Sequence, residues 1–177
     1  NSNQDGKFLT QLYVQQPYTD YDRTNLVEKS AVMFLNSAKV DVAAGKSKEV
    51  TITIPTKYLA SYDANNAKTY IVDAGDYYFT AATDAHNAVN NILAAKGYTV
   101  ENTDGRMTAD GNVALTYKWT NAALDSTTYA TSETGTAITN LFDESDPNKS
   151  SDAPGSVTWM SRSDWTGTIP TAPAQLT

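Results

Sequence analysis

Short segments of alternating apolar and polar residues, separated by turn residues, fill the first half of this 177-residue chain. The clearest segment runs from Glu49 to Ile54, where Val50, Ile52 and Ile54 share one face and two threonines share the other. β-branched residues at this spacing are typical of a half-buried strand. The same criteria predict further strands at 8–15, 31–35, 40–42, 69–72 and 77–82. About six short strands with frequent turns favour an antiparallel β-sandwich.

One segment departs from this pattern. Apolar residues recur at helical spacing between Asp84 and Lys96. Asp84 is a suitable N-cap, and Gly97 is a suitable residue just beyond the helix end. The sequence therefore predicts one amphipathic helix at 84–96 that packs on the sandwich.

The chain becomes polar and irregular after Gly97. Residues 113–119 alternate and predict one more strand, 138–142 predict another short element, and 18–29 and 143–155 are expected to be loops. The expected fold class is mostly β: an immunoglobulin/fibronectin III-like antiparallel β-sandwich with one amphipathic helix and an irregular C-terminal extension. We expect the sandwich and helix at 1–97, an extension packed on the sandwich at 98–165, and a linker at 166–177.

The charge balance excludes several classes of partner. The net charge of −7 and the pI near 4.5 disfavour nucleic acid and anionic membranes. No apolar run approaches the roughly 18 residues of a membrane helix. Cysteine is absent and His86 is the one histidine, so thiolate chemistry and sites with two histidines are excluded. We expect no metal and no cofactor.

Aromatic side chains supply the candidate binding residues. The chain has eleven tyrosines and three tryptophans, and aromatic rings suit stacking against the C–H faces of sugars. Packing in the core or at an interface is the competing interpretation, and it is favoured. The candidate sugar-contacting residues are Tyr18, Tyr21, Trp159, Arg162 and Trp165.

No group of residues satisfies the requirements of catalysis. Asp164 beside Trp165 has the composition of a glycosidase nucleophile on a sugar platform, but retaining chemistry needs a second carboxylate about 5 Å away on a rigid scaffold. The acidic residues between Asp143 and Asp152 do not have the spacing of an EF-hand loop. The chain by itself is expected not to be an enzyme.

Several separated motifs, occurring in order, together resemble one family. They are TQLYVQQPYTDYDRTNLVEKSA at 10–31, VTITIPTKYLASYD at 50–63 and YIVDAGDYYFTAATDAHNAVNNILAAKG at 70–97. These stretches resemble the fibronectin type III-like domain of glycoside hydrolase family 3. ALTYKWTNAALDSTTYA at 114–130 and the end of the chain resemble the segment that follows this domain in a bacterial subset with permuted domain order. The family usually has one or more strands before the turn at Asn3–Gly6, which would leave a sheet edge here unpaired.

The resemblance implies a β-glucosidase-like parent enzyme that hydrolyses terminal β-linked sugars. The module would brace its catalytic domains and would contribute no catalytic residue, because Ser163–Asp164–Trp165 matches the nucleophile motif of the family in three letters alone. The expected partners are the other domains of that glycosidase, with an oligosaccharide and edge-strand self-association as further partner hypotheses. A carbohydrate-binding module and a cell-surface adhesin or pilin-type module remain as alternatives, and the compartment is left open between cytoplasmic and cell-associated.

Overall fold

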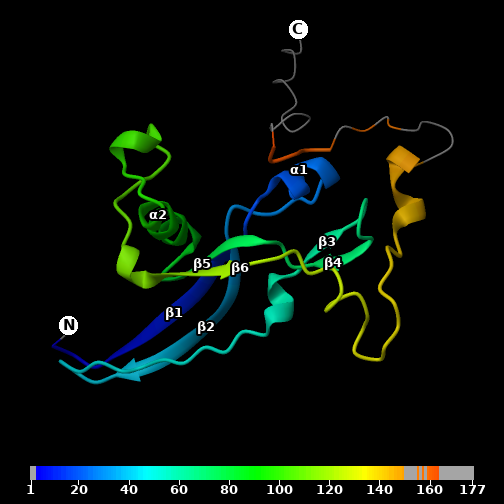
Figure 1. The fold of residues 1–177 in the computed structure, drawn as a ribbon. Helices are drawn as coiled ribbons and strands as arrows, with labels where there is room; N and C mark the ends of the chain where they lie inside the picture. The colour runs from blue at the N-terminus through cyan, green and yellow to red at the C-terminus, as the bar shows by residue number, and fades with distance from the viewer. Residues whose placement is uncertain (1–2, 150–154, 156, 158, 164–177) are drawn as a thin grey trace, which may run out of the picture. The chain divides into compact units, whose positions relative to one another are not determined.

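The computed structural model describes residues 3–149, 155, 157 and 159–163 (Figure 1). The chain divides into two compact units, each built from separated stretches of sequence. The first unit comprises Asn1–Pro17, Ser30–Leu59 and Asp73–Leu124, and the second comprises Tyr18–Lys29, Ala60–Val72 and Asp125–Thr177. Among the described residues, strand residues outnumber helical residues, 29% against 21%, and the strand pairs are antiparallel. The expected mostly-β class is confirmed, and the pairing is consistent with a fibronectin III-like sandwich.

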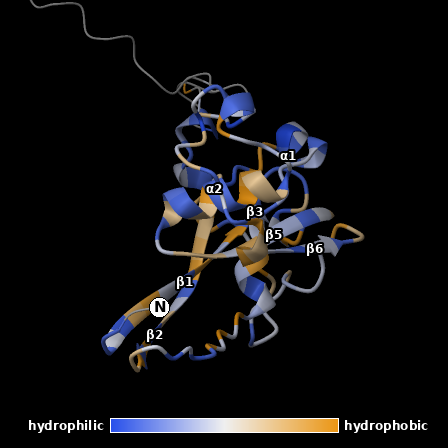
Figure 2. Ribbon diagram, turned by 90° about the vertical axis from the view of Figure 1, so that its left-hand side faces the viewer, coloured by the Kyte–Doolittle hydropathy of each residue, from blue (hydrophilic) through white to orange (hydrophobic). Residues whose placement is uncertain are grey.

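A four-stranded sheet forms the first unit. Its strands are β1 (Gly6–Gln15), β2 (Met33–Val42), β5 (Gly75–Ala82) and β6 (Thr116–Asn121), in the spatial order β2-β1-β5-β6. β5 pairs with the second half of β1, from Gln11 to Gln15, so the first half of β1 pairs with β2 alone. Figure 1 shows this two-stranded ribbon extending past β5. Figure 2 shows polar and apolar residues interspersed along it.

The core of the first unit lies where the sheet meets helix α2 (Ala85–Ala95). Val14, Tyr77 and Ile92 are fully buried there. The ring of Tyr77 contacts Trp119 of the neighbouring strand, with ring centroids 5.1 Å apart. Hydrophobic burial on this scale is the main term that holds a sheet and a helix together.

Helix α2 begins and ends where the sequence predicts. The Asp84 side chain accepts a hydrogen bond from the Asn87 amide at 2.9 Å, and Gly97 adopts the left-handed conformation with φ +86°. Buried Asn91 then fixes the helix to the sheet, because its amide donates to the Thr80 hydroxyl at 3.2 Å. A Cβ atom at Gly111 would lie 2.0 Å from the carbonyl oxygen of Asn90, so only glycine fits against this helix.

The second unit contains the hairpin β3 (Ser61–Asp63) and β4 (Thr69–Ile71) and the short helix α1 (Asp20–Asn25). An isolated bridge joins Val72 to Asp125, with backbone bonds of 2.8 and 2.9 Å. Short 3₁₀ helices lie at Thr56–Leu59, Glu101–Thr103 and Val113–Leu115 in the first unit and at Asp143–Ser145 and Pro147–Lys149 in the second. In the part of the chain that the structure describes, no helix is long and apolar enough to span a membrane.

Several boundaries predicted from the sequence are wrong. Residues 18–29 were expected to be a loop but contain α1, whose six residues are too few to produce a helical period. The strands predicted at 31–35 and 40–42 are one strand, because β1 pairs with β2 along its whole length. β3 was not predicted, no element forms at 138–142, and 113–115 is 3₁₀ helix ahead of β6.

The segment 49–54, which has the clearest strand pattern, is not a strand. Val50, Ile52 and Ile54 are half-buried and the threonines between them are exposed, so the predicted alternation of faces is present. Among the described residues, no bridge or backbone hydrogen bond joins this segment to another strand. A strand requires a paired neighbour, and side-chain pattern alone does not supply one.

Candidate functional site

Two of the residues singled out from the sequence, Tyr18 and Tyr21, lie in the segment 18–29 of the second unit, and a third, Arg162, contacts Tyr18. Thr19 and Asp22 form a capping box that starts α1: the Thr19 amide donates to Asp22 Oδ2 at 2.6 Å, and the Asp22 amide donates to Thr19 Oγ1 at 3.4 Å. Leu26 ends the helix in the left-handed conformation, with φ 56°. This capping box was the sequence signal for the helix that the loop assignment missed.

A buried ion pair follows the helix. Lys29 Nζ lies 2.6 Å from Asp22 Oδ1, and the two side chains are 1% and 0% exposed. Asp22 therefore both caps the first turn of α1 and neutralises a lysine that lies seven residues further along the chain. Removing Lys29 would leave the buried Asp22 carboxylate without this counter-ion in the protein interior.

The Asp63 carboxylate ties α1 to the β3–β4 hairpin. It is fully buried and accepts backbone hydrogen bonds from Asn65, Asn66 and Ala67 at 2.9–3.0 Å, which shape the turn between the strands. The Tyr21 hydroxyl donates to its second oxygen at 2.5 Å. Burial alone would raise the pKa of Asp63, but these hydrogen bonds outweigh burial and hold the pKa below its ordinary value.

Tyr18 and Arg162 form a second contact of this loop, with residues far away in sequence. The Arg162 guanidinium carbon lies 5.1 Å from the Tyr18 ring centroid. Glu28 anchors the same C-terminal segment, because its carboxylate accepts from the Ser161 hydroxyl at 2.7 Å and from the Arg162 amide, 134 positions away, at 2.9 Å. The structure thus brings together two of the five candidate sugar-contacting residues, Tyr18 and Arg162.

Comparison with known families assigns one segment of the chain. Residues 9–85 match the family model described as fibronectin type III-like domain. This segment is a fibronectin type III-like domain. The match runs through β1 to β5 and includes Tyr21, Asp22, Lys29 and Asp63.

Solved structures similar to the chain include several β-glucosidases. β-Glucosidase 3B from Thermotoga neapolitana, in complex with α-D-glucose, is 18% identical with a TM-score of 0.45, and the match covers 70% of this chain. A GH3 β-glucosidase from Bifidobacterium adolescentis is 22% identical with a TM-score of 0.39 over 48% of this chain. The chain spans 13% and 11% of the lengths of these two proteins. A search of curated protein sequences gave no match.

The other three candidate sugar-contacting residues do not take part in the Tyr18–Arg162 contact. Tyr21 lies in the fibronectin type III-like domain, where its hydroxyl is engaged by Asp63 and also accepts from the Asn66 amide at 2.9 Å. Trp159 lies beyond the domain and is 59% exposed, next to Met160 at 51%. Trp165, with Asp164, lies outside the described residues.

The two buried carboxylates of the site are occupied by internal contacts. In the fibronectin type III-like domain, Asp22 and Asp63 each satisfy several donors, and both were missed as site residues by the sequence analysis. Within the described residues, no cluster of three or more His, Cys, Asp or Glu side chains could hold a metal ion. His86 is exposed at the start of α2.

Proposed function

We propose that this chain is a non-catalytic structural module of a family 3 glycoside hydrolase, a β-glucosidase-like enzyme that hydrolyses terminal β-linked sugars. The observation that carries the proposal is the fibronectin type III-like match at 9–85. The QLYV, LASYD and AGDY motifs, which occur in the family order at 11–14, 59–63 and 74–77, support the assignment to that enzyme family.

The module would act by fixing the orientation of the catalytic domains. Catalysis that uses groups from several domains loses on the order of 100-fold in rate from an error of about 1 Å. A brace must therefore be rigid, and the contacts of Asp22 and Asp63 supply rigidity to the segment 18–29. The other domains of the glycosidase are the partners, with 1–97 as the sandwich module, 98–165 as an extension packed on it, and 166–177 as a linker.

A secondary role in substrate selection is proposed for exposed Trp159 and half-buried Arg162 and Tyr18 of the second unit. Trp159, Arg162 and Tyr18 would lie at the rim of the active site of the enzyme and contact an oligosaccharide, together with Trp165. Replacing Trp159 by alanine in that enzyme is then expected to raise KM for oligosaccharides and to leave KM for a small aryl β-glucoside unchanged. Unchanged kinetics on both substrates would count against a rim position.

The brace proposal makes a direct prediction for the 177-residue chain. The purified chain is expected to hydrolyse an aryl β-glucoside no faster than buffer does. In the complete glycosidase, Lys29→Met is expected to lower kcat for small and large substrates alike, because it loosens the brace without touching sugar. Turnover by the isolated chain, or a complete enzyme with full kcat in spite of a loosened module, would contradict the proposal.

The segment 49–54, which no described strand pairs with, supports a further partner proposal: self-association in which this segment would become an edge strand. If two copies pair antiparallel about Ile52, Val50 of each copy lies opposite Ile54 of the other. This reciprocal arrangement is what an isologous contact requires. Sedimentation equilibrium is expected to show a dimer whose dissociation constant rises on Ile52→Pro, since proline cannot donate to a strand ladder. A monomer at all concentrations, or a dimer that Ile52→Pro leaves intact, would remove this proposal.

A further inference from the structure

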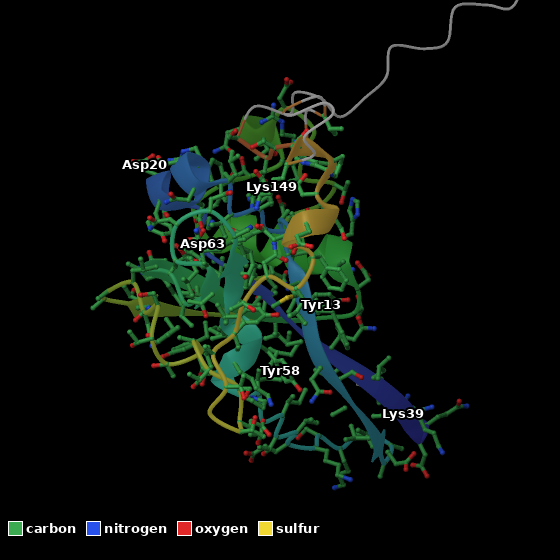
Figure 3. The ribbon with its side chains drawn as sticks, turned by 90° about the vertical axis from the view of Figure 1, so that its right-hand side faces the viewer. Tyr13, Asp20, Lys39, Tyr58, Asp63 and Lys149 are labelled. Atoms are coloured by element: carbon green, nitrogen blue, oxygen red, sulfur yellow. The ribbon has the colours of Figure 1, made fainter. Side chains whose placement is uncertain are left out.

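A small hollow lies in the second unit, away from the Tyr18–Arg162 contact. Its volume is about 230 Å³, below the roughly 300–1,000 Å³ of pockets that hold drug-sized ligands, so it suits one small ring. The β3–β4 hairpin and the segment 139–149 form its walls (Figure 3, which labels Lys149). The lining residues that matter to its chemistry are Tyr62, Ala64, Lys68, Asn140, Asp143 and Lys149.

An aromatic ring in a fixed orientation forms one wall. Tyr62 packs edge-on against Tyr70, with ring centroids 5.3 Å apart and ring planes at 73°. The two tyrosines are a cross-strand pair of β3 and β4, which limits their freedom. Tyr62 therefore lines the hollow with a ring of restricted orientation, and aromatic rings can stack on the C–H groups of a sugar.

Paired donors and acceptors of the segment 140–149 form another part of the lining. The Asp143 carboxylate accepts from Lys149 Nζ and from the Asn140 amide at 3.2 Å. The hydrogen bond from Lys149 is the main cause that lowers the pKa of Asp143, so the carboxylate is charged at neutral pH. Lys68 lines the same hollow and adds a second ammonium.

We propose that this hollow binds the pyranose ring of one neutral sugar. A hydroxyl group both donates and accepts, so adjacent hydroxyls of a pyranose match a carboxylate beside an ammonium while the opposite ring face meets Tyr62. Asp143 opposes an anionic ligand and the two lysines oppose a cationic one, so a neutral polyol is the ligand class that the charges favour. This site does not depend on the brace function, and none of its residues belongs to the Tyr18–Arg162 contact.

The test is a titration of the isotopically labelled 177-residue chain, followed by the amide resonances of residues 62–68 and 140–149. The probes are D-glucose, D-xylose, the open-chain polyol D-glucitol and sodium phosphate. We expect saturable shifts with a millimolar dissociation constant for a pyranose, and binding about tenfold weaker for glucitol, which has no ring face to stack. Phosphate is expected to leave these resonances unshifted.

Three variants separate the roles of the walls. Tyr62→Ala and Asp143→Asn are each expected to weaken pyranose binding about tenfold, whereas Tyr62→Phe keeps the ring and the affinity. Tyr58→Ala is the matched control, because Tyr58 is 52% exposed in the first unit and outside the hollow. Asp143 is exposed in the short 3₁₀ helix Asp143–Ser145, so Asp143→Asn provides the test even where Tyr62→Ala fails to fold.

Four outcomes would overturn the proposal. They are no saturable shift with either pyranose, equal binding of glucitol and glucose, binding of phosphate in place of sugar, and an affinity that Asp143→Asn leaves unchanged. Each outcome leaves the brace proposal untouched, because that proposal is decided by turnover and by the kinetics of the complete enzyme.

Discussion

Replacing Asp63 by alanine is expected to lower the free energy of unfolding by about 3–4 kcal/mol. The variant removes an acceptor that serves three backbone amides and the Tyr21 hydroxyl. Hydrogen bonds to a charged group contribute about 1.5–3 kcal/mol each, and exposed Asn65 and Asn66 regain part of this from water. Urea denaturation followed by tryptophan fluorescence measures the loss.

Two controls show whether the loss comes from this acceptor. Asp84→Ala removes an aspartate that caps an exposed helix end, and its effect is expected to be much smaller. Tyr21→Phe removes one of the four donors and is expected to cost about 1.5–3 kcal/mol. An Asp63→Ala protein as stable as the wild type would show that the β3–β4 turn forms without its carboxylate.

The same carboxylate makes stability depend on pH. The folded protein holds the pKa of Asp63 below its ordinary value of 3.8, so its stabilisation is present above that pH and is lost as the pH falls through the folded pKa. Asp125 acts in the same direction, because hydrogen bonds from Thr128 and Thr127 lower its pKa to about 2. Wild-type stability is thus expected to fall between about pH 4 and pH 2, less steeply in Asp63→Asn.

The sequence predicts those parts of the fold that depend on local pattern. The helix at 84–96 is confirmed with its Asp84 cap, because apolar period, cap and terminal glycine agree. β4 and β5 are confirmed within two residues at their ends. Each of these elements buries one face, and the apolar residues of that face recur at a regular spacing within the segment itself.

The parts that the sequence could not predict depend on distant neighbours. The segment 49–54 has the side-chain pattern of a strand, but its own residues do not determine whether another strand pairs with it. Tyr18 and Arg162 lie near opposite ends of the sequence, so no rule based on residue spacing predicts their contact. The ion pair of Asp22 could not be predicted, because its counter-ion, Lys29, becomes its neighbour only when α1 forms.

Breaking the Asp22–Lys29 pair is the second large effect that we expect. Lys29→Met would leave the Asp22 carboxylate buried without its counter-ion and lower the free energy of unfolding by about 3–5 kcal/mol. The double variant Asp22→Asn/Lys29→Met removes both charges together. Its loss in the free energy of unfolding is expected to be about 1–3 kcal/mol smaller than the sum of the losses of the two single variants, because the two residues are coupled neighbours.

The exposed pair of Lys7 and Asp41 is the matched control for this prediction. Its charged atoms lie 3.8 Å apart and the side chains are 70% and 77% exposed, so Lys7→Met is expected to leave the unfolding curve unchanged within error. Strictly additive single losses in the double variant would show that Lys29 and Asp22 do not act as a pair. Both lysines pair with an aspartate, and they differ in burial. Equal losses in the free energy of unfolding for Lys29→Met and Lys7→Met would therefore contradict the fold described for residues 18–29.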